Sequence, residues 1–224
     1  MCISNSGKFL FTTGMDFEIK QWDLATKTLH SKWPQLHKTP VYQMVISKND
    51  KFLFTAGKNG YLIKRNIETR KVTKDYGEIH LDWILTLCIM NSGEFLFTAG
   101  ADNRLKQWDL RSDTLHCDYG EIHDYAVTCT ATTPDNVYLF TSSDDATLKQ
   151  WDIAGTKLHK DYRQIHEDCV KVMAITPNGM FLFTGSDDKT IRMWSVKEET
   201  LFMDLGVVHQ DWIRTLVISK NGEF

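Results

Sequence analysis

The sequence predicts an all-β fold in which short antiparallel sheets repeat along the chain, and three observations lead to this prediction. Residues of several chemical types recur every 43 positions, without any insertion. Each unit contains four short apolar or alternating runs, separated by residues that favour turns. No segment shows the 3.6-residue period of an amphipathic helix. Together these features indicate one domain built from equivalent sheets.

The period is specific because unrelated residue types keep the same register. An aromatic residue recurs at one position of the unit, in Phe9, Phe52, Phe95, Tyr138, Phe181 and Phe224. A histidine recurs at another position, in His37, His80, His123, His166 and His209. The repeat units fall at about 1–46, 47–89, 90–132, 133–175 and 176–218, and a further unit starts at 219–224. With no linker or shift in composition, residues 1–224 are expected to form a single domain.

Four strands are predicted within each 43-residue stretch, as residues 84–119 illustrate. Residues 84–89 form an apolar run suited to a buried strand, and residues 95–99 are rich in aromatic residues and threonine. Residues 104–110 alternate, and residues 114–119 are more polar, as expected for an outer edge strand. Four short strands per unit of this length are typical of a blade of a β-propeller, in which neighbouring blades cover each other.

The sequence resembles the WD40-repeat family, and the resemblance rests on the segment around the second and third strands. Residues 97–109 read FTAGADNRLKQWD, and the segments 140–152 and 183–195 repeat this pattern, although Ser195 replaces the final aspartate. Of the Gly-His pair that is usual in the family, only the histidine is present, as in His123, His166 and His209. The resemblance covers the whole chain and implies a β-propeller of four-stranded antiparallel blades.

The resemblance also implies a buried hydrogen-bonded tetrad in each blade, made of a histidine, a turn aspartate, a threonine and a tryptophan. Such a set satisfies the rule that buried polar groups are paired. By position, the complete tetrads are His80, Asp102, Thr98 and Trp108; His123, Asp145, Thr141 and Trp151; and His166, Asp188, Thr184 and Trp194. In the second unit, Asn59 replaces the aspartate and Arg65 the tryptophan, so this blade is expected to be the least stable.

Histidine, aspartate and a hydroxyl residue are also the groups of nucleophilic catalysis. Their recurrence in several blades favours a structural role, because a catalytic centre needs one site. The remaining histidines, His30, His116 and His159, fall on the repeat as well, and no His/Cys cluster has the spacing of metal ligands. The sequence therefore predicts no catalytic, cofactor-binding or metal site, and the protein is not expected to be an enzyme.

Composition argues against several other classes of protein. The net charge is −3 with both signs mixed along the chain, so no basic patch for a nucleic acid is visible. No apolar run approaches the roughly 18–20 residues of a membrane span. The five cysteines are odd in number and form no CxxC pair, which favours reduced thiols in a cytoplasmic protein. The expected partners are other proteins or peptides, without nucleic acid or membrane.

Two arrangements of the ring remain open at this stage. In the first, residues 211–218 supply the inner strand of the N-terminal blade, and His209 completes a tetrad with Asp16, Thr12 and Trp22 in a closed five-blade ring. In the second, the chain is part of a larger propeller, most often of seven blades in this family. The duplication of residues 4–9 by residues 219–224 favours the second arrangement.

The resemblance further implies which positions face a partner, on the narrow face around the central channel. The position three residues after each histidine is occupied by Pro40, Trp83, Ala126, Cys169 and Trp212. The position five residues after it is occupied by Tyr42, Leu85, Thr128, Lys171 and Arg214. The position before the turn aspartate is occupied by Met15, Lys58, Ala101, Asp144 and Asp187.

These positions vary between units while the framework does not, as expected for binding residues on a rigid scaffold. Tryptophan, tyrosine and arginine dominate interface hot spots, and carboxylates suit a basic segment of a partner. The predicted partner-binding residues are Trp83, Trp212, Tyr42, Arg214, Lys171, Asp144 and Asp187. The predicted function is a non-catalytic interaction scaffold; the alternative is a structural subunit of a large assembly that contacts its neighbours through the rim.

Overall fold

The computed structural model describes residues 1–33 and 37–219, and within these residues every regular element is a β-strand. The strands form five four-stranded antiparallel sheets, which confirms the predicted fold class. The predicted strands of residues 84–119 are confirmed to within two residues at each end. The expected further unit at 219–224 lies outside the described residues, except for Ser219.

Each sheet takes its four strands consecutively from the chain. The first sheet contains β1 (Cys2–Ile3), β2 (Phe9–Thr13), β3 (Ile19–Asp23) and β4 (Thr28–Trp33). The second contains β5 (Val41–Ile46), β6 (Phe52–Gly57), β7 (Tyr61–Asn66) and β8 (Val72–Glu78). The third contains β9 (Ile84–Ile89), β10 (Phe95–Gly100), β11 (Arg104–Asp109) and β12 (Thr114–Glu121). The fourth contains β13 (Val127–Thr132), β14 (Tyr138–Ser143), β15 (Thr147–Asp152) and β16 (Lys157–Gln164), and the fifth β17 (Val170–Ile175), β18 (Phe181–Ser186), β19 (Thr190–Ser195) and β20 (Thr200–Val207).

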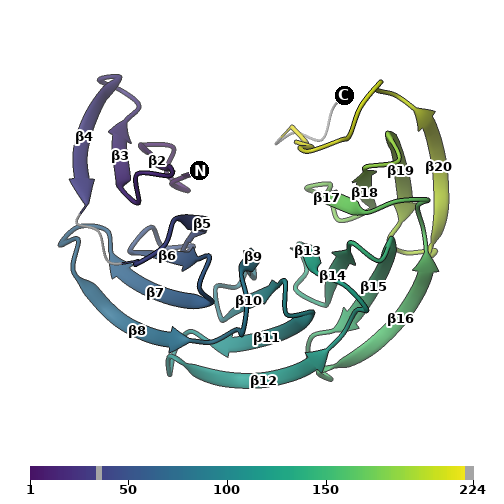
Figure 1. Ribbon diagram of the computed structural model, residues 1–224, viewed down its shortest axis with the longest axis horizontal. Helices are drawn as coiled ribbons and strands as arrows, with labels where there is room; N and C mark the ends of the chain where they lie inside the picture. The colour runs from purple at the N-terminus through teal and green to yellow at the C-terminus, as the bar shows by residue number, and fades with distance from the viewer. Residues whose placement is uncertain (34–36, 220–224) are drawn as a thin grey trace.

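The sheets stand side by side along an open arc (Figure 1), with β5, β9, β13 and β17 on its inner side and β8, β12, β16 and β20 on its outer side. The 43-residue units and the sheets are therefore offset, because the units 1–46, 47–89, 90–132 and 133–175 each end with the inner strand of the next sheet. Because consecutive strands are antiparallel, their connections alternate between the two ends of each sheet. The turn between the second and third strands therefore lies at one end, and the other two turns lie at the opposite end.

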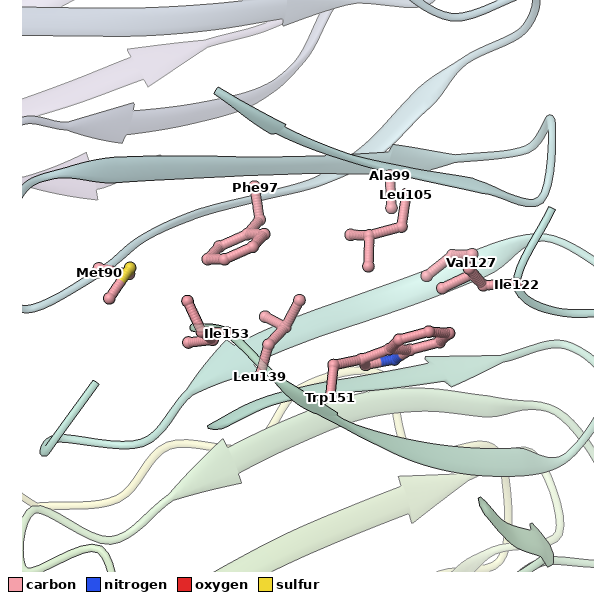
Figure 2. Close-up of a cluster of buried hydrophobic side chains, with 9 residues drawn as sticks. All are labelled: Met90, Phe97, Ala99, Leu105, Ile122, Val127, Leu139, Trp151 and Ile153. Carbon is pink, nitrogen blue, oxygen red and sulfur yellow. The ribbon is translucent and has the colours of Figure 1, made fainter. Parts of the chain in front are cut away.

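The sheets adhere because both faces of each one are apolar. In β10, Leu96 and Phe97 are adjacent and therefore point to opposite faces; both are fully buried. Leu96 packs in a cluster with Phe54 of the second sheet, whereas Phe97 packs with Leu139 of the fourth. Figure 2 shows this second cluster, in which Trp151 also lies between the third and fourth sheets. Each internal sheet is thus held by a separate apolar layer on each side.

The described chain does not form the closed ring of the first arrangement. The first sheet takes its innermost strand from its own residues, Cys2–Ile3, and residues 211–219 belong to no sheet. Figure 1 shows the corresponding opening between the first and fifth sheets. His209 is exposed, so it does not complete a tetrad with the first sheet. Over residues 1–33 and 37–219 there is no helix with the length and apolarity that crossing a membrane requires.

We predict that Phe97→Ala lowers the free energy of unfolding by about 3–5 kcal/mol, because it leaves a cavity between two sheets. Phe202→Ala is the control, since Phe202 lies on the outer strand β20 and is 56% exposed. Urea denaturation followed by circular dichroism gives both values. Equal losses in the two variants would contradict the assignment of Phe97 to an inter-sheet core.

Candidate functional site

The loops that precede the inner strands lie at the same end of the sheets as the turns between second and third strands. The chain enters β9 from the loop at residues 79–83, and the hairpin of β10 and β11 turns at residues 101–103 beside it. The contact is direct, because the Ala101 amide donates a hydrogen bond to the Trp83 carbonyl at 2.9 Å. We call this end of the sheets the narrow face, and it brings the predicted binding positions together.

Gly100 permits this close approach of loop and hairpin. A β-carbon at this position would lie 2.0 Å from the Trp83 carbonyl oxygen, far inside van der Waals contact. The absence of a side chain at Gly100 therefore allows the Trp83 backbone to lie directly against the end of β10. The Trp83 amide also donates a hydrogen bond to the Asp82 carboxylate at 2.7 Å, so the residue is held from both sides.

A hydrogen-bonded tetrad lies just below the narrow face in each of the third, fourth and fifth sheets. In the third sheet, His80 Nδ1 contacts both oxygens of Asp102 at 2.9 Å, and His80 Nε2 contacts Thr98 Oγ1 at 2.8 Å. Trp108 Nε1 donates to the same hydroxyl at 3.1 Å. The fourth and fifth sheets repeat this arrangement with His123, Asp145, Thr141 and Trp151, and with His166, Asp188, Thr184 and Trp194.

The chemistry of the tetrad assigns its protons. A carboxylate only accepts, so the histidine carries its proton on Nδ1 and accepts the threonine hydroxyl at Nε2. Burial lowers the pKa of His166, which favours this neutral ring. Burial also raises the pKa of Asp188, but hydrogen bonds from Thr190, the Glu167 amide and His166 outweigh it and bring the pKa to about 2. The aspartate is thus ionised and ties the loop to the turn.

The second sheet lacks the carboxylate and the indole. His37 Nε2 still contacts Thr55 Oγ1 at 2.8 Å, but His37 Nδ1 is buried without a hydrogen-bond partner among the described residues. Asn59 instead accepts a hydrogen bond from Thr39 at 3.1 Å. Burial, together with the nearby Arg65 guanidinium, lowers the pKa of His37 to about 4. In the first sheet, Trp22 and Thr12 are linked at 2.9 Å, and Asp16 pairs with Lys20.

On the narrow face, four inner strands surround a hollow of about 410 Å³. Five of the predicted binding residues line it: Tyr42, Trp83, Asp144, Lys171 and Arg214. The other lining residues are Leu85, Ala101, Ala126 and Thr128. They occupy contact positions that the family resemblance indicated, but they were not among the seven predicted binding residues. Residues separated by up to 172 positions in the chain thus meet in one hollow.

Two half-exposed aromatic side chains, Tyr42 and Trp83, form one wall, and a lysine lies beside them. The Tyr42 and Trp83 rings lie 6.3 Å apart between centroids, tilted by 43°. The Lys58 ammonium lies 3.9 Å from the centroid of Trp83 and 5.9 Å from that of Tyr42. Lys58 occupies one of the contact positions that the family resemblance indicates, but it was not among the predicted binding residues. Its position in the turn, between two aromatic positions of neighbouring loops, was the feature of the sequence that could have identified it. The lysine thus lies within cation–π distance of both rings.

The opposite wall is charged. Lys171 forms an ion pair with Asp144 and lies 3.8 Å from Asp187 Oδ2. Burial lowers the pKa of Lys171, but the hydrogen bond to Asp144 outweighs burial and raises it, so the ammonium stays charged. Asp187 does not itself line the hollow but lies behind Lys171; its side chain is nine-tenths buried, and burial raises its pKa. The structure thus places both carboxylates around one lysine.

Trp212 and Arg214 lie beside each other in the segment after β20. The Arg214 guanidinium is 4.4 Å from the centroid of the Trp212 ring and 3.9 Å from Asp187 Oδ1. Arg214 lines the hollow, whereas Trp212, 54% exposed, lies next to it. Trp212 and Asp187 are thus the two of the seven predicted residues that do not line the hollow.

One group of potential metal ligands lies near this wall. Asp168, Cys169 and Asp187 offer ligand atoms within 4.8 Å of one another. Burial raises the pKa of the Cys169 thiol to about 11, and the Asp144 carboxylate adds to this. The thiolate that a metal needs is therefore disfavoured, and the Lys171 ammonium already neutralises Asp187. These three residues do not fit a metal site.

Five four-stranded sheets stacked along an arc, with a tetrad in three of them, define a repeat protein of the β-propeller class. The profile of the family described as "WD domain, G-beta repeat" matches residues 1–23, 75–109, 119–152 and 159–195. These segments make up more than half of the chain, and the chain belongs to the WD40-repeat family. The unmatched stretch 24–74 contains most of the altered second sheet, including Asn59 and Arg65. A comparison with curated proteins gives no match.

We predict that Thr98→Val lowers the free energy of unfolding by about 2–3 kcal/mol, because one hydroxyl serves both His80 and Trp108. Thr55→Val is the matched control: Thr55 is buried at the equivalent position and contacts His37, but its sheet has Arg65 at the position of the tryptophan. Its expected loss is about 1–2 kcal/mol. Chemical denaturation of both variants measures the difference, and a larger loss for Thr55→Val would contradict the tetrad as a unit.

We predict that stability falls as the pH is lowered from about 6.5 to about 4, because the unfolded chain protonates His37 before the folded one does. The pKa of about 4 bounds the loss from this group at about 3 kcal/mol. His37→Gln removes this contribution, so the unfolding free energy should depend less on pH in that window.

Asn59→Asp tests the role of His37 in the pH dependence by restoring the missing carboxylate. A carboxylate beside His37 Nδ1, as in the third sheet, should raise the histidine pKa and also flatten the pH dependence. The measurement is denaturation at several pH values between 4 and 7. A slope equal to that of the unchanged protein in both variants would show that His37 is not its source.

Proposed function

We propose that the protein is a non-catalytic scaffold that binds a peptide or a loop of a partner protein on its narrow face. One observation carries the proposal: five residues selected as contact positions converge on a single hollow. The hollow has the size of a ligand site, which is about 300–1,000 Å³. A cytoplasmic location, favoured by the five free cysteines, is part of this proposal.

The walls of the hollow indicate what the partner segment carries. Tyr42 and Trp83 offer half-exposed aromatic surface, which contributes strongly to binding when it is desolvated. Arg214, with half of its side chain exposed, offers planar donors for a carboxylate or a carbonyl group. Ala101 and Ala126 form a small-residue floor that leaves room for a side chain between the walls. An extended segment with one large side chain matches this outline.

A second candidate function is a structural role in a large assembly, with contacts through the rim. The observation that favours it is a run of exposed apolar side chains on the outer strand β20. This run consists of Leu201, Phe202, Met203, Leu205 and Val207. Exposed apolar patches of this kind mark interaction surfaces, so the rim is the alternative contact surface.

Trp83→Ala and Arg214→Ala should leave the circular dichroism spectrum unchanged and abolish partner capture in a pull-down read by quantitative mass spectrometry. Each removes a hot-spot side chain, and such truncations cost about 2 kcal/mol or more, a loss of at least about thirty-fold in affinity. Phe202→Ala is the rim variant and should retain the partners. Retention by the two narrow-face variants with loss in Phe202→Ala would favour the assembly role.

A further inference from the structure

We propose that a second site, at the opposite end of the first two sheets, binds an acidic segment of a partner protein. The site is a pocket of about 500 Å³, larger than the narrow-face hollow. We call it the rim pocket; Lys8, Phe9, His30, Lys51, Ile67 and Arg70 are among its lining residues. It lies where the β1–β2, β5–β6 and β7–β8 turns meet, far from the hollow, so it is a separate site.

The later junctions between sheets show which side chains occupy the position equivalent to the rim pocket. In each later junction, the residue at the end of the third-to-fourth-strand turn reaches back to the preceding sheet. Asp113 receives hydrogen bonds from Lys64 at 2.7 Å and from Tyr76 at 2.7 Å. Glu199 contacts His159 Nε2 at 2.6 Å, and its backbone carbonyl accepts from Lys160. Thr156, at the same position in the fourth sheet, lies near the Cys117 side chain of the third sheet.

At the first junction the equivalent residue is Arg70, with the opposite charge to Asp113 and Glu199. Arg70 is exposed, and its guanidinium forms no hydrogen bond or ion pair with any described residue. Two other junctions have a carboxylate at this position, but the first junction has none. The rim pocket lies at this position. The residue that corresponds to His159 is His30, which lines the pocket.

The lining of the rim pocket suits a carboxylate from outside. Lys8, Lys51 and Arg70 supply three cations, none of which pairs with a carboxylate within the part of the chain that the structure describes. Gln21 is 98% buried and also lines the pocket; its Oε1 accepts from Ser31 and Trp33, whereas its Nε2 has no acceptor among the described residues.

Two carboxylates also line the pocket, and neither occupies the site. Asp50 already accepts hydrogen bonds from the amides of Asn5 and Ser6, at 2.7 Å and 2.8 Å. Glu68 lies exposed in the β7–β8 turn. Phe9 and Ile67 add apolar surface, so the occupant is a peptide segment in which an aspartate or glutamate is next to an apolar side chain.

The test uses the full chain and two capped peptides, acetyl-Leu-Glu-Leu-amide and its glutamine counterpart, in a titration followed by ¹⁵N–¹H NMR. We expect the glutamate peptide to produce saturable shifts at residues 66–70 and at His30, with at least about five-fold weaker binding of the glutamine peptide. Arg70→Asp should weaken the glutamate peptide at least about ten-fold, since it removes a cation and supplies an internal carboxylate. Aspartate tolerates the left-handed backbone of residue 70, whose φ is 61°.

Lys197→Asp is the matched control, because it makes the same charge change in the exposed turn before β20 and should leave binding unchanged. Glu68→Gln should strengthen binding about two-fold or more by removing a like charge. Trp83→Ala should have no effect here, which separates this site from the narrow-face proposal. No saturable shift up to about 20 mM peptide, equal binding of both peptides, equal weakening by Lys197→Asp, or the same shifts with acetate alone would each overturn the proposal.

Discussion

The structure depends on one constraint: the four-stranded sheets carry apolar faces that they bury only against neighbouring sheets. Adjacent residues such as Leu96 and Phe97 are both fully buried, although they point to opposite sides. The apolar clusters accordingly never lie within one sheet; each contains residues of two consecutive sheets. Stacking in this way fixes the orientation of every sheet, and the loops at both ends inherit their positions from it.

The tetrads join this scaffold to the face that we propose to be functional. Each one links the loop before an inner strand to the hairpin turn next to it, through the contact between its histidine and its aspartate. These are the two segments that carry the contact positions of the narrow face. A buried, fully paired polar set defines a geometry more narrowly than apolar packing does. The side chains around the hollow therefore project from a rigid frame, which reduces the entropy lost on binding.

Departures from the repeat have structural consequences that extend across sheet boundaries. In the second sheet, the position of a tetrad tryptophan holds Arg65, and the neighbouring position holds Lys64 where the first, third and fourth sheets have glutamine and the fifth has Met193. The Lys64 ammonium is buried and pairs with Asp113, which belongs to the next sheet. Because Arg70 has no such partner in the first sheet, one junction is tied by charge and the other is open. The same family framework thus yields chemically different junctions.

The sequence by itself determined the repeat and the strands, because period and residue type follow directly from local patterns. Through its resemblance to the family, it also indicated the residues of each tetrad. It also indicated the contact positions, since the resemblance supplies their place in the unit. Only the tertiary structure decided how these residues combine. Lys58 stacks on Trp83, Asp187 lies buried behind Lys171, and Trp212 turns out beside the hollow rather than in it.

Those details, like the opening between the first and fifth sheets and the rim pocket at Arg70, involve side chains from different sheets. A period along the chain specifies what each unit contains, but not which side chains of two units meet once they are packed. That is decided by the distance and angle between stacked sheets, which depend on the apolar layers between them and not on any single unit.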